Sequence, residues 1–262
     1  MDWLDNIITT FFDFEAMLQV LPQLFAVGLV NTLVISIWAT LIGIVLGMLV
    51  AIMGISPSRW LRIPARVYTD IFRGLPAILT ILLIGQGFAR FSQQVFGPSP
   101  YPLGILALSL IASAYMGEIF RAGIQSVDRG QLEACRALGM SYGKAMRLVV
   151  VPQGVRRVLP ALVNQFIAIV KDSSLVYFLG LLVSERELFR VGQDAAVLTG
   201  NLSPLVAAGL FYLAITVPLT HLVNYFDNRF RTGRRKAAPP KSGLDEVEEQ
   251  NPTPTLTYGE NS

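Results

Sequence analysis

The chain is poor in charge and in the residues that most often carry chemistry. Of its 262 residues only 15% are charged, and it contains one cysteine and one histidine. The lone Cys135 cannot form an intramolecular disulfide, and His221 has no partner that would make it a catalytic base. No cluster of histidine and cysteine offers a metal site. These absences exclude a disulfide scaffold and argue against an enzyme.

Charge is missing altogether from long intervals. No Asp, Glu, Lys or Arg occurs in 16–58, 74–89, 91–117 or 195–226. With 53% hydrophobic residues and a mean hydropathy of +0.53, the chain is too apolar for an ordinary soluble domain. About 20 apolar residues span a bilayer as a helix. We therefore predict an all-α polytopic membrane protein with five transmembrane helices, near 23–53, 68–90, 101–124, 158–184 and 204–227.

Two of these spans are unusual. The first is over-long, so we expect it to tilt or to extend into water. The fourth has Lys171 and Asp172 at its middle, and its length fits one helix that carries a charged pair.

Lysine and arginine lie mostly on one side of the predicted spans. The opposite connections hold only Arg90, Arg186 and Arg190, and the segment before the first span has neither residue type. Because cytoplasmic loops carry the excess of positive charge, we expect the N-terminus outside and the C-terminus inside. The predicted cytoplasmic side carries Arg59, Arg62, Arg66, Arg73, Arg129, Arg136, Lys144, Arg147, Arg156, Arg157, Arg229, Arg231, Arg234, Arg235, Lys236 and Lys241.

Two terminal segments flank the predicted transmembrane domain, which covers 23–230. Segment 1–22 is acidic where a cleaved signal would be positive, and Trp3, Ile7 and Phe11 recur at helical spacing. It is predicted to be an external interfacial helix, with a disordered leader as the alternative. Segment 231–262 turns acidic and proline-rich, which is typical of a disordered cytoplasmic tail.

A basic stretch at 126–157 separates the third and fourth spans. Its first helix is predicted to run over 131–138 and to stop at Gly139 in a left-handed turn. Ser141 can cap a second helix over 142–151, which we expect Pro152 to end. The product is a helix-turn-helix on the cytoplasmic face. Because both of its ends enter the membrane, a role in binding nucleic acid is poorly supported.

The spacing within this stretch resembles the "EAA" loop of the membrane subunits of ATP-binding-cassette importers. It has Glu133-Ala134-Cys135, then three residues, Gly139, nine residues, Val149, one residue and Val151-Pro152. In that family the loop inserts into a cleft of the nucleotide-binding subunit. The resemblance implies a coupling loop that contains Glu133, Ala134, Arg136, Gly139, Met140, Ser141 and Pro152.

Further segments are similar to the polar amino acid branch of those importers. They are YTDIFRGLP at 68–76, AYMGEIFRAGI at 114–124, Gly130-Gln131, and KDSSL at 171–175. Together with the loop, the match covers roughly 20–230. The resemblance implies the type I permease fold in a bacterial cytoplasmic membrane, and cargo such as histidine, arginine, glutamine or glutamate. It also implies as partners a second permease subunit, nucleotide-binding ATPase subunits and an extracytoplasmic amino-acid-binding protein.

No phosphate-binding loop is present to supply the energy. The segment from Gly139 to Ala145 has three residues between its glycines where that motif needs four, and Ala145 replaces the metal-binding hydroxyl. We therefore expect no cofactor in this chain, with ATP and Mg²⁺ bound by the partner ATPase.

Charge inside the membrane costs at least about 2.5–3.5 kcal/mol per ionised side chain, so intramembrane charges should face protein or water. Asn164 and Asp172 fall on one stripe of the predicted fourth helix, which suggests a translocation path. The alternative is that these charges are structural ion pairs between helices, for example from Lys171 and Asp172 to Glu118 or Arg121. The candidate path or ion-pair residues are Tyr115, Glu118, Arg121, Asn164, Lys171, Asp172, Ser173 and Ser174.

These observations favour alternating access driven by a separate ATPase over two rival classes. A channel or secondary transporter would show an internal repeat, which we do not see, and a membrane enzyme would need a convergent acid-base or metal set. The amino acid transported and the choice between homodimer and heterodimer are not encoded in any motif that we recognise.

Overall fold

A computed structural model describes residues 2–232, and within them the side chains of Trp3 and of residues 6–224. Residues 1–225 form one unit and residues 226–262 a second, of which only the end of the last helix is described. Most of the predicted disordered tail, 233–262, lies outside the described residues.

Every regular element of the described part is helical, which confirms the predicted all-α class. The elements include two π-helical turns, η1 and η2, and two 3-10 turns, η3 and η4. In chain order they are α1 Asp2–Phe11, α2 Phe14–Gln23, η1 Leu24–Leu29, α3 Val30–Ile55, α4 Arg59–Gly74, α5 Ala77–Gly87, α6 Ala89–Phe96, α7 Tyr101–Gln125, α8 Arg129–Ala137, α9 Tyr142–Ala145, η2 Met146–Val150, α10 Val151–Asp172, η3 Ser173–Leu179, η4 Val183–Glu185, α11 Leu188–Thr199 and α12 Ser203–Thr232.

Within the described residues, four helical stretches are long and apolar enough to cross a membrane: Asn6–Ile55, Tyr101–Gln125, Tyr142–Leu179 and Ser203–Asn224. The bent pair α4 and α5 makes a fifth when it is counted as one broken span. The prediction of five spans agrees with this arrangement. The over-long first span is explained by the helix that runs from α2 through η1 into α3.

The second span is not the continuous helix predicted over 68–90. α4 ends at Gly74, and α5 begins at Ala77 after a bend of 106°. Leu75 and Pro76 are both extended, with ψ of 143° and 134°. A proline disfavours the helical conformation of the residue before it, which explains why the helix stops here.

The fourth span also differs from its prediction. α10 begins at Val151 as part of a helical run from Tyr142, and its regular part ends at Asp172 before the 3-10 turn η3. Lys171 and Asp172 therefore lie at the C-terminal end of α10, not at the middle of a longer helix. Gly180 follows η3 with a φ of +75°, a conformation that favours glycine.

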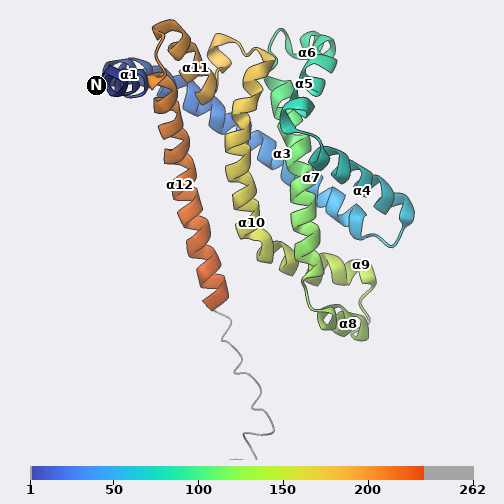
Figure 1. Cartoon of the computed structure of the whole chain (residues 1–262). Helices are drawn as coiled ribbons and strands as arrows, with labels where there is room; N and C mark the ends of the chain where they lie inside the picture. Colours follow the sequence, from blue (N-terminus) through green and yellow to red (C-terminus); the bar gives the residue numbers. More distant parts are fainter. Residues whose placement is uncertain (1, 233–262) are drawn as a thin grey trace, which may run out of the picture. The chain divides into compact units, whose positions relative to one another are not determined.

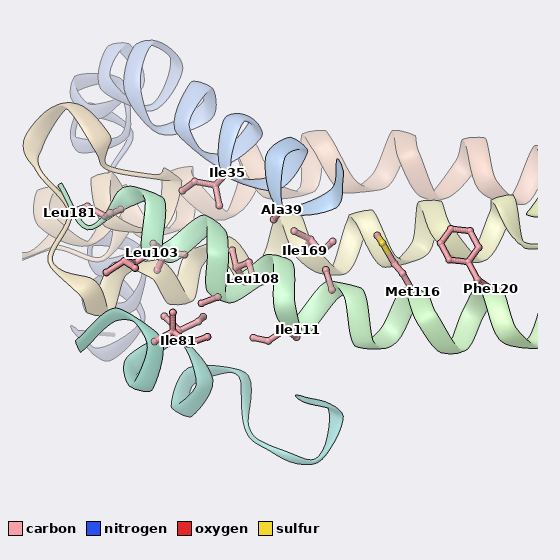
Figure 2. Close-up of a cluster of buried hydrophobic side chains, with 14 of the residues drawn as sticks. Ile35, Ala39, Ile81, Leu103, Leu108, Ile111, Met116, Phe120, Ile169 and Leu181 are labelled. Atoms are coloured by element: carbon pink, nitrogen blue, oxygen red, sulfur yellow. The ribbon is translucent and has the colours of Figure 1, made fainter. Parts of the chain in front are cut away.

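α7 is the central helix of the bundle and packs against α3, α4, α5 and α10. Figure 2 shows Leu103, Leu108, Ile111, Met116 and Phe120 following one another along α7. These side chains meet Ile35 and Ala39 from α3, Ile81 from α5 and Ile169 from α10.

Two glycines let α3 approach α7 closely. A Cβ at Gly43 would lie 2.9 Å from the Cβ of Ala112, and one at Gly47 would lie 2.9 Å from the Cβ of Met116. Small residues four apart allow membrane helices to pack at short distance. Gly43 and Gly47 therefore serve the packing of α3 on α7.

The N-terminal segment is helical and is held by hydrogen bonds to the turn between α11 and α12. The amide of Leu202 donates to the carbonyl of Thr10 at 3.0 Å, and the amide of Asp13 donates to Ser203 Oγ at 2.8 Å. Asn201 Nδ2 donates to the carbonyl of Thr9 and to Asp13 Oδ2. Figure 1 shows α1 beside α11, at the opposite end of the bundle from α8 and α9.

Candidate functional site

The connection between α7 and α10 folds into two short helices whose ends are set by local hydrogen bonds. Asp128 caps α8 by accepting a hydrogen bond from the amide of Gly130 at 2.8 Å. Gly139 follows α8 with a φ of +81°, as predicted for a left-handed stop. Ser141 then caps α9, where its Oγ accepts from the amide of Lys144 at 3.4 Å. The two predicted helices are therefore present, with Asp128 as an additional cap.

Pro152 does not end the second helix, which corrects the prediction. The chain passes from α9 through η2 into α10 without a break, and Pro152 lies in the first turn of α10. A proline lacks an amide hydrogen, but a π turn can accommodate it by shifting the hydrogen-bond register. The amide of Val151 donates to the carbonyl of Met146, five residues earlier, which is that shift.

The outer surface of α8 and α9 is exposed. Glu133, Ala134 and Arg136 are exposed, and the Arg136 guanidinium closes the turn by donating to the carbonyl of Met140 at 2.9 Å. Leu138, at the tip of the loop, is 83% exposed.

The inner surface of the same loop is fixed to the bundle. Its apolar contacts form a cluster that joins the end of α7 to η2 and includes Ile124, Val127, Val150, Leu132 and Met146. Arg157 on α10 donates to the carbonyl of Ser126, and Gln153 Nε2 donates to Gln131 Oε1 at 3.3 Å. A displacement of the loop is therefore transmitted to both α7 and α10.

α7 and α10 cross where the loop leaves and re-enters the bundle. A Cβ at Gly154 would lie 2.7 Å from Cα of Ile124, and one at Gly123 would lie 2.7 Å from the carbonyl oxygen of Gly154. Neither approach tolerates a side chain without movement of the backbone. The two glycines therefore define the crossing.

A cavity of about 750 Å³ lies beside the loop, between α3, α4, α7, α8 and α9. Glu118 lines it and accepts two hydrogen bonds from Arg121, at 3.0 and 2.5 Å. Arg73 lies 3.8 Å from the same carboxylate, and its guanidinium stacks over the Tyr115 ring at 5.3 Å. The predicted residues Tyr115, Glu118 and Arg121 thus come together, in an ion-pair group that also contains Arg73.

The remaining predicted path residues lie elsewhere. Asn164 and Lys171 are exposed on α10, and Asp172 is partly buried at its end. Ser173 is fully buried and donates to the carbonyl of Val170 at 2.7 Å, while Ser174 donates to the carbonyl of Lys171 at 2.7 Å. Among the described residues, neither Lys171 nor Asp172 forms an ion pair with another side chain within 4.0 Å. The structure therefore separates the candidates into two groups, one in the last turns of α7 and one at the far end of α10.

A buried polar cluster at that far end was missed by sequence reasoning. Glu187 is fully buried, caps α11 by accepting from the amides of Phe189 and Arg190 at 2.6 and 2.8 Å, and accepts from Tyr212 Oη at 3.0 Å. Burial raises the pKa of the Glu187 carboxyl to about 7, although these three hydrogen bonds and the charge of Arg190 oppose the rise. The cluster ties the start of α11 to α12.

Next to it, a second group of charges was also missed. Asp194 pairs with Arg186 at 3.1 Å and with Arg190 at 2.9 Å, and Arg190 stacks over the Tyr177 ring at 4.7 Å. The spacing of four residues between Arg190 and Asp194 is the signal that could have found this pair.

The fold defines a polytopic membrane protein with a helical loop, capped at both of its short helices and packed on α7 and α10, at one end of the bundle. Residues 43–232 match the family described as "Binding-protein-dependent transport system inner membrane component", and the chain belongs to that family. It is the permease component of an amino acid ATP-binding-cassette importer.

Several named proteins are similar to the chain over most of their length. It is 34% identical to "Arginine transport system permease protein ArtQ" of Bacillus subtilis (strain 168), over 84% of this chain and 98% of ArtQ. It is 35% identical to "Glutamate/aspartate import permease protein GltK" of Escherichia coli O6:H1, over 83% of this chain and 98% of GltK.

Solved structures agree with these sequence matches. "Crystal structure of an amino acid ABC transporter with histidines" contains a chain that is 33% identical, with a TM-score of 0.72, over 83% of this chain and 98% of the other. A chain of the MetNI methionine ABC transporter in inward facing conformations has a TM-score of 0.64 at 20% identity, which supports the fold alone.

Proposed function

We propose that this permease moves a polar or charged amino acid across the bacterial cytoplasmic membrane by alternating access, driven by ATP hydrolysis in a separate subunit docked on residues 131–152. ATP and Mg²⁺ bind to that partner and not to this chain. A second permease subunit, of the same or a similar kind, completes the path. An extracytoplasmic binding protein delivers the amino acid at the end where α6 and α11 lie.

The single observation that carries this proposal is the loop of α8 and α9. Its outer surface exposes Glu133, Arg136 and Leu138, while its inner surface packs on both α7 and α10. A partner that binds the outer surface and moves the loop therefore moves both α7 and α10. Such a contact allows a soluble ATPase to shift the equilibrium between two conformations of the membrane helices.

The polar face of α10 supports a paired permease. Asn164 and Lys171 are exposed in a helix that crosses the membrane, and an exposed charge in lipid is costly. A second subunit packed near this face would exclude lipid and leave a polar passage between the two. Lys171 and Asp172 would then lie near the outer end of that passage.

The substrate class rests on the polar character of this face and on the similar proteins. ArtQ is named for arginine transport and GltK for glutamate and aspartate import. These names have in common a charged amino acid. The ion-pair group of Glu118, Arg121 and Arg73 serves a different purpose in this proposal, because Glu118 pairs with Arg121 on α7 and attracts Arg73 of α4, which holds α4 to α7.

The proposal is tested by reconstituting the chain with its ATPase and its binding protein in lipid vesicles. We expect one or a few polar amino acids, from a panel that includes apolar ones, to stimulate both ATP hydrolysis and uptake. Stimulation by apolar amino acids alone would contradict the substrate class. Uptake that continues without ATP would contradict the mechanism.

Docking is tested separately by retention of the ATPase on the purified chain. Glu133→Lys and Gly139→Pro should abolish retention while the chain still inserts into the membrane. The matched control is Glu15→Lys, which makes the same charge change on an exposed carboxylate at the opposite end of the bundle. Full retention by both loop variants would exclude the loop as the docking element.

Sidedness is tested by thiol labelling. In a Cys135→Ala background, a cysteine introduced at Leu138 should react with an impermeant reagent only from the cytoplasmic side. Labelling from the outer side of intact cells would contradict the predicted topology.

A further inference from the structure

The cavity beside the loop has a wall of arginines that the ion-pair group does not neutralise. Its lining contains five arginines against three carboxylates. Glu118 neutralises Arg121 and lies near Arg73, and Asp128 is engaged as the cap of α8. Among the described residues, no carboxylate lies within 4.0 Å of the charged groups of Arg62, Arg66 or Arg129.

These three arginines come from two walls of the same space. Arg62 and Arg66 lie four apart on α4 and therefore project from one face of that helix, together with Asp70 and Arg73. Arg129 lies at the first position of α8, across the cavity. Arginines that line one cavity from two helices suit a phosphate, which can accept several charge-assisted hydrogen bonds at once.

The other face of α4 is strongly apolar and exposed. Trp60 is 89% exposed, and Leu61, Ile63, Val67 and Ile71 are each about half exposed. Tryptophan and aliphatic residues on one face of a helix and arginines on the other suit the boundary between acyl chains and headgroups, so the broken span of α4 and α5 begins at that boundary with the N-terminal turns of α4. The lysine and arginine count places this boundary at the inner leaflet.

We propose that the cavity holds the headgroup phosphate of an anionic inner-leaflet phospholipid, bound between Arg62 and Arg66 of α4 and Arg129 of α8. The acyl chains of that lipid run along the apolar face of α4. A volume of about 750 Å³ accommodates a headgroup together with water.

The position of the site connects lipid binding to the loop. Arg129 belongs to the first turn of α8, so a lipid held between α4 and α8 fixes the spacing of the loop from the rest of the bundle. This inference rests on the geometry of the cavity and does not require the proposed function, and its test needs neither the ATPase nor transport.

The experiment measures binding of fluorescent phosphatidylglycerol and phosphatidylcholine to the purified full-length chain in detergent. We expect tighter binding of phosphatidylglycerol. Each arginine near an anionic headgroup contributes about 1 kcal/mol, which is about a fivefold change in affinity. The double variant Arg62→Gln/Arg66→Gln should therefore weaken binding of phosphatidylglycerol by about 30-fold and leave that of phosphatidylcholine unchanged.

The matched control removes the same charge outside the cavity. Arg59 lies on α4, and Arg156 on α10, but neither lines the space. The double variant Arg59→Gln/Arg156→Gln should change the affinity by less than about threefold. An equal loss in both double variants would show non-specific attraction and overturn the site.

Two further arms decide between the remaining outcomes. If Arg62→Gln/Arg66→Gln does not fold, Arg129→Gln from the opposite wall should still weaken binding by about fivefold, and Arg62→Lys/Arg66→Lys should retain most of it. Inorganic phosphate at millimolar concentration should not displace the lipid. Displacement would assign the cavity to a soluble phosphate and overturn the lipid assignment, and unchanged binding in all arginine variants would overturn the site.

Discussion

The crossing of α7 and α10 at Gly123 and Gly154 predicts a large effect from a single added methyl group. In Gly154→Ala, the new Cβ would lie 2.7 and 2.8 Å from Cα and N of Ile124 and 2.9 Å from the carbonyl carbon of Gly123. Non-bonded carbon atoms prefer about 3.5–4.0 Å, so the two helices must separate by roughly 0.7–1 Å. All three contacts are backbone atoms, which cannot move aside as a flexible side chain can.

The cost of overpacking of this kind is about 1–3 kcal/mol. Gly154 lies one helical turn after η2, and α8 packs against η2. We therefore expect the strain to weaken the packing of the loop before that of the rest of the bundle. Cys135 reports this directly, because it lies on α8, is 8% exposed and is the single cysteine of the chain. Its reaction with a thiol reagent should accelerate by between about fivefold and about 150-fold in Gly154→Ala.

The assay follows the rate of thiol labelling of the purified chain in detergent at a temperature where the wild type is folded. Gly209→Ala on α12 is the matched control, because a Cβ there meets nothing within 4 Å. Its labelling rate should equal that of the wild type. An unchanged rate in Gly154→Ala, or the same acceleration in both variants, would refute the view that the glycine crossing fixes the loop.

Substitutions at three other positions give distinct results. Gly139→Ala should weaken binding of the ATPase by about 1–2 kcal/mol, because an alanine is strained at a φ of +81°. Gly139→Asn should weaken this binding less, and equal losses in the two variants would contradict the conformational argument. Glu118→Gln should lower the free energy of unfolding by less than about 1 kcal/mol, because its ion pair with Arg121 is partly exposed; a loss above about 3 kcal/mol in the thermal melt would contradict this. Burial raises the pKa of Glu187 from 4.5 to about 7, so its contribution to stability is greatest below about pH 4.5 and is lost as the pH rises through about 7. Glu187→Gln should flatten the pH dependence of the melting temperature over this range. An unaltered slope would show that another group titrates.

The sequence was sufficient where the pattern of apolar residues alone decides the structure. The helix at 101–125 was predicted within one residue, since the uncharged run after Pro100 extends to residue 117 and the polar loop follows soon after it. The turn at Gly139 and the cap at Ser141 were also predicted, because both depend on local backbone chemistry and not on distant contacts.

The errors arose where proline was interpreted without its neighbours. Pro152 was expected to end a helix, but the π turn of η2 absorbs the missing hydrogen bond and the helix continues. Pro76 lies in a run that is apolar enough to span, and it breaks that span by 106°. Whether a proline is absorbed or breaks a helix depends on tertiary packing, which a single sequence does not report.

The candidate site was predicted in part. The ion pair between Glu118 and Arg121 follows from their spacing of three residues on one helix. The approach of Arg73 to Glu118 cannot be predicted in this way, because it depends on how α4 packs against α7 in the fold. The cluster around Glu187 is the least predictable feature. Glutamate is an uncommon helix cap, and its partner Tyr212 is 25 residues away.

The hydrogen bonds between the N-terminal segment and the turn before α12 set an order for biosynthesis. Leu202 and Ser203 lie about 190 residues after Thr10 and Asp13, the groups to which they bind. At about 5–20 residues per second, the ribosome needs roughly 10 to 40 s to make that length of chain. During this delay α1 must remain at the membrane surface with its polar groups hydrated. The outer end of the first span therefore gains its hydrogen-bond partners only when α11 and α12 have been synthesised.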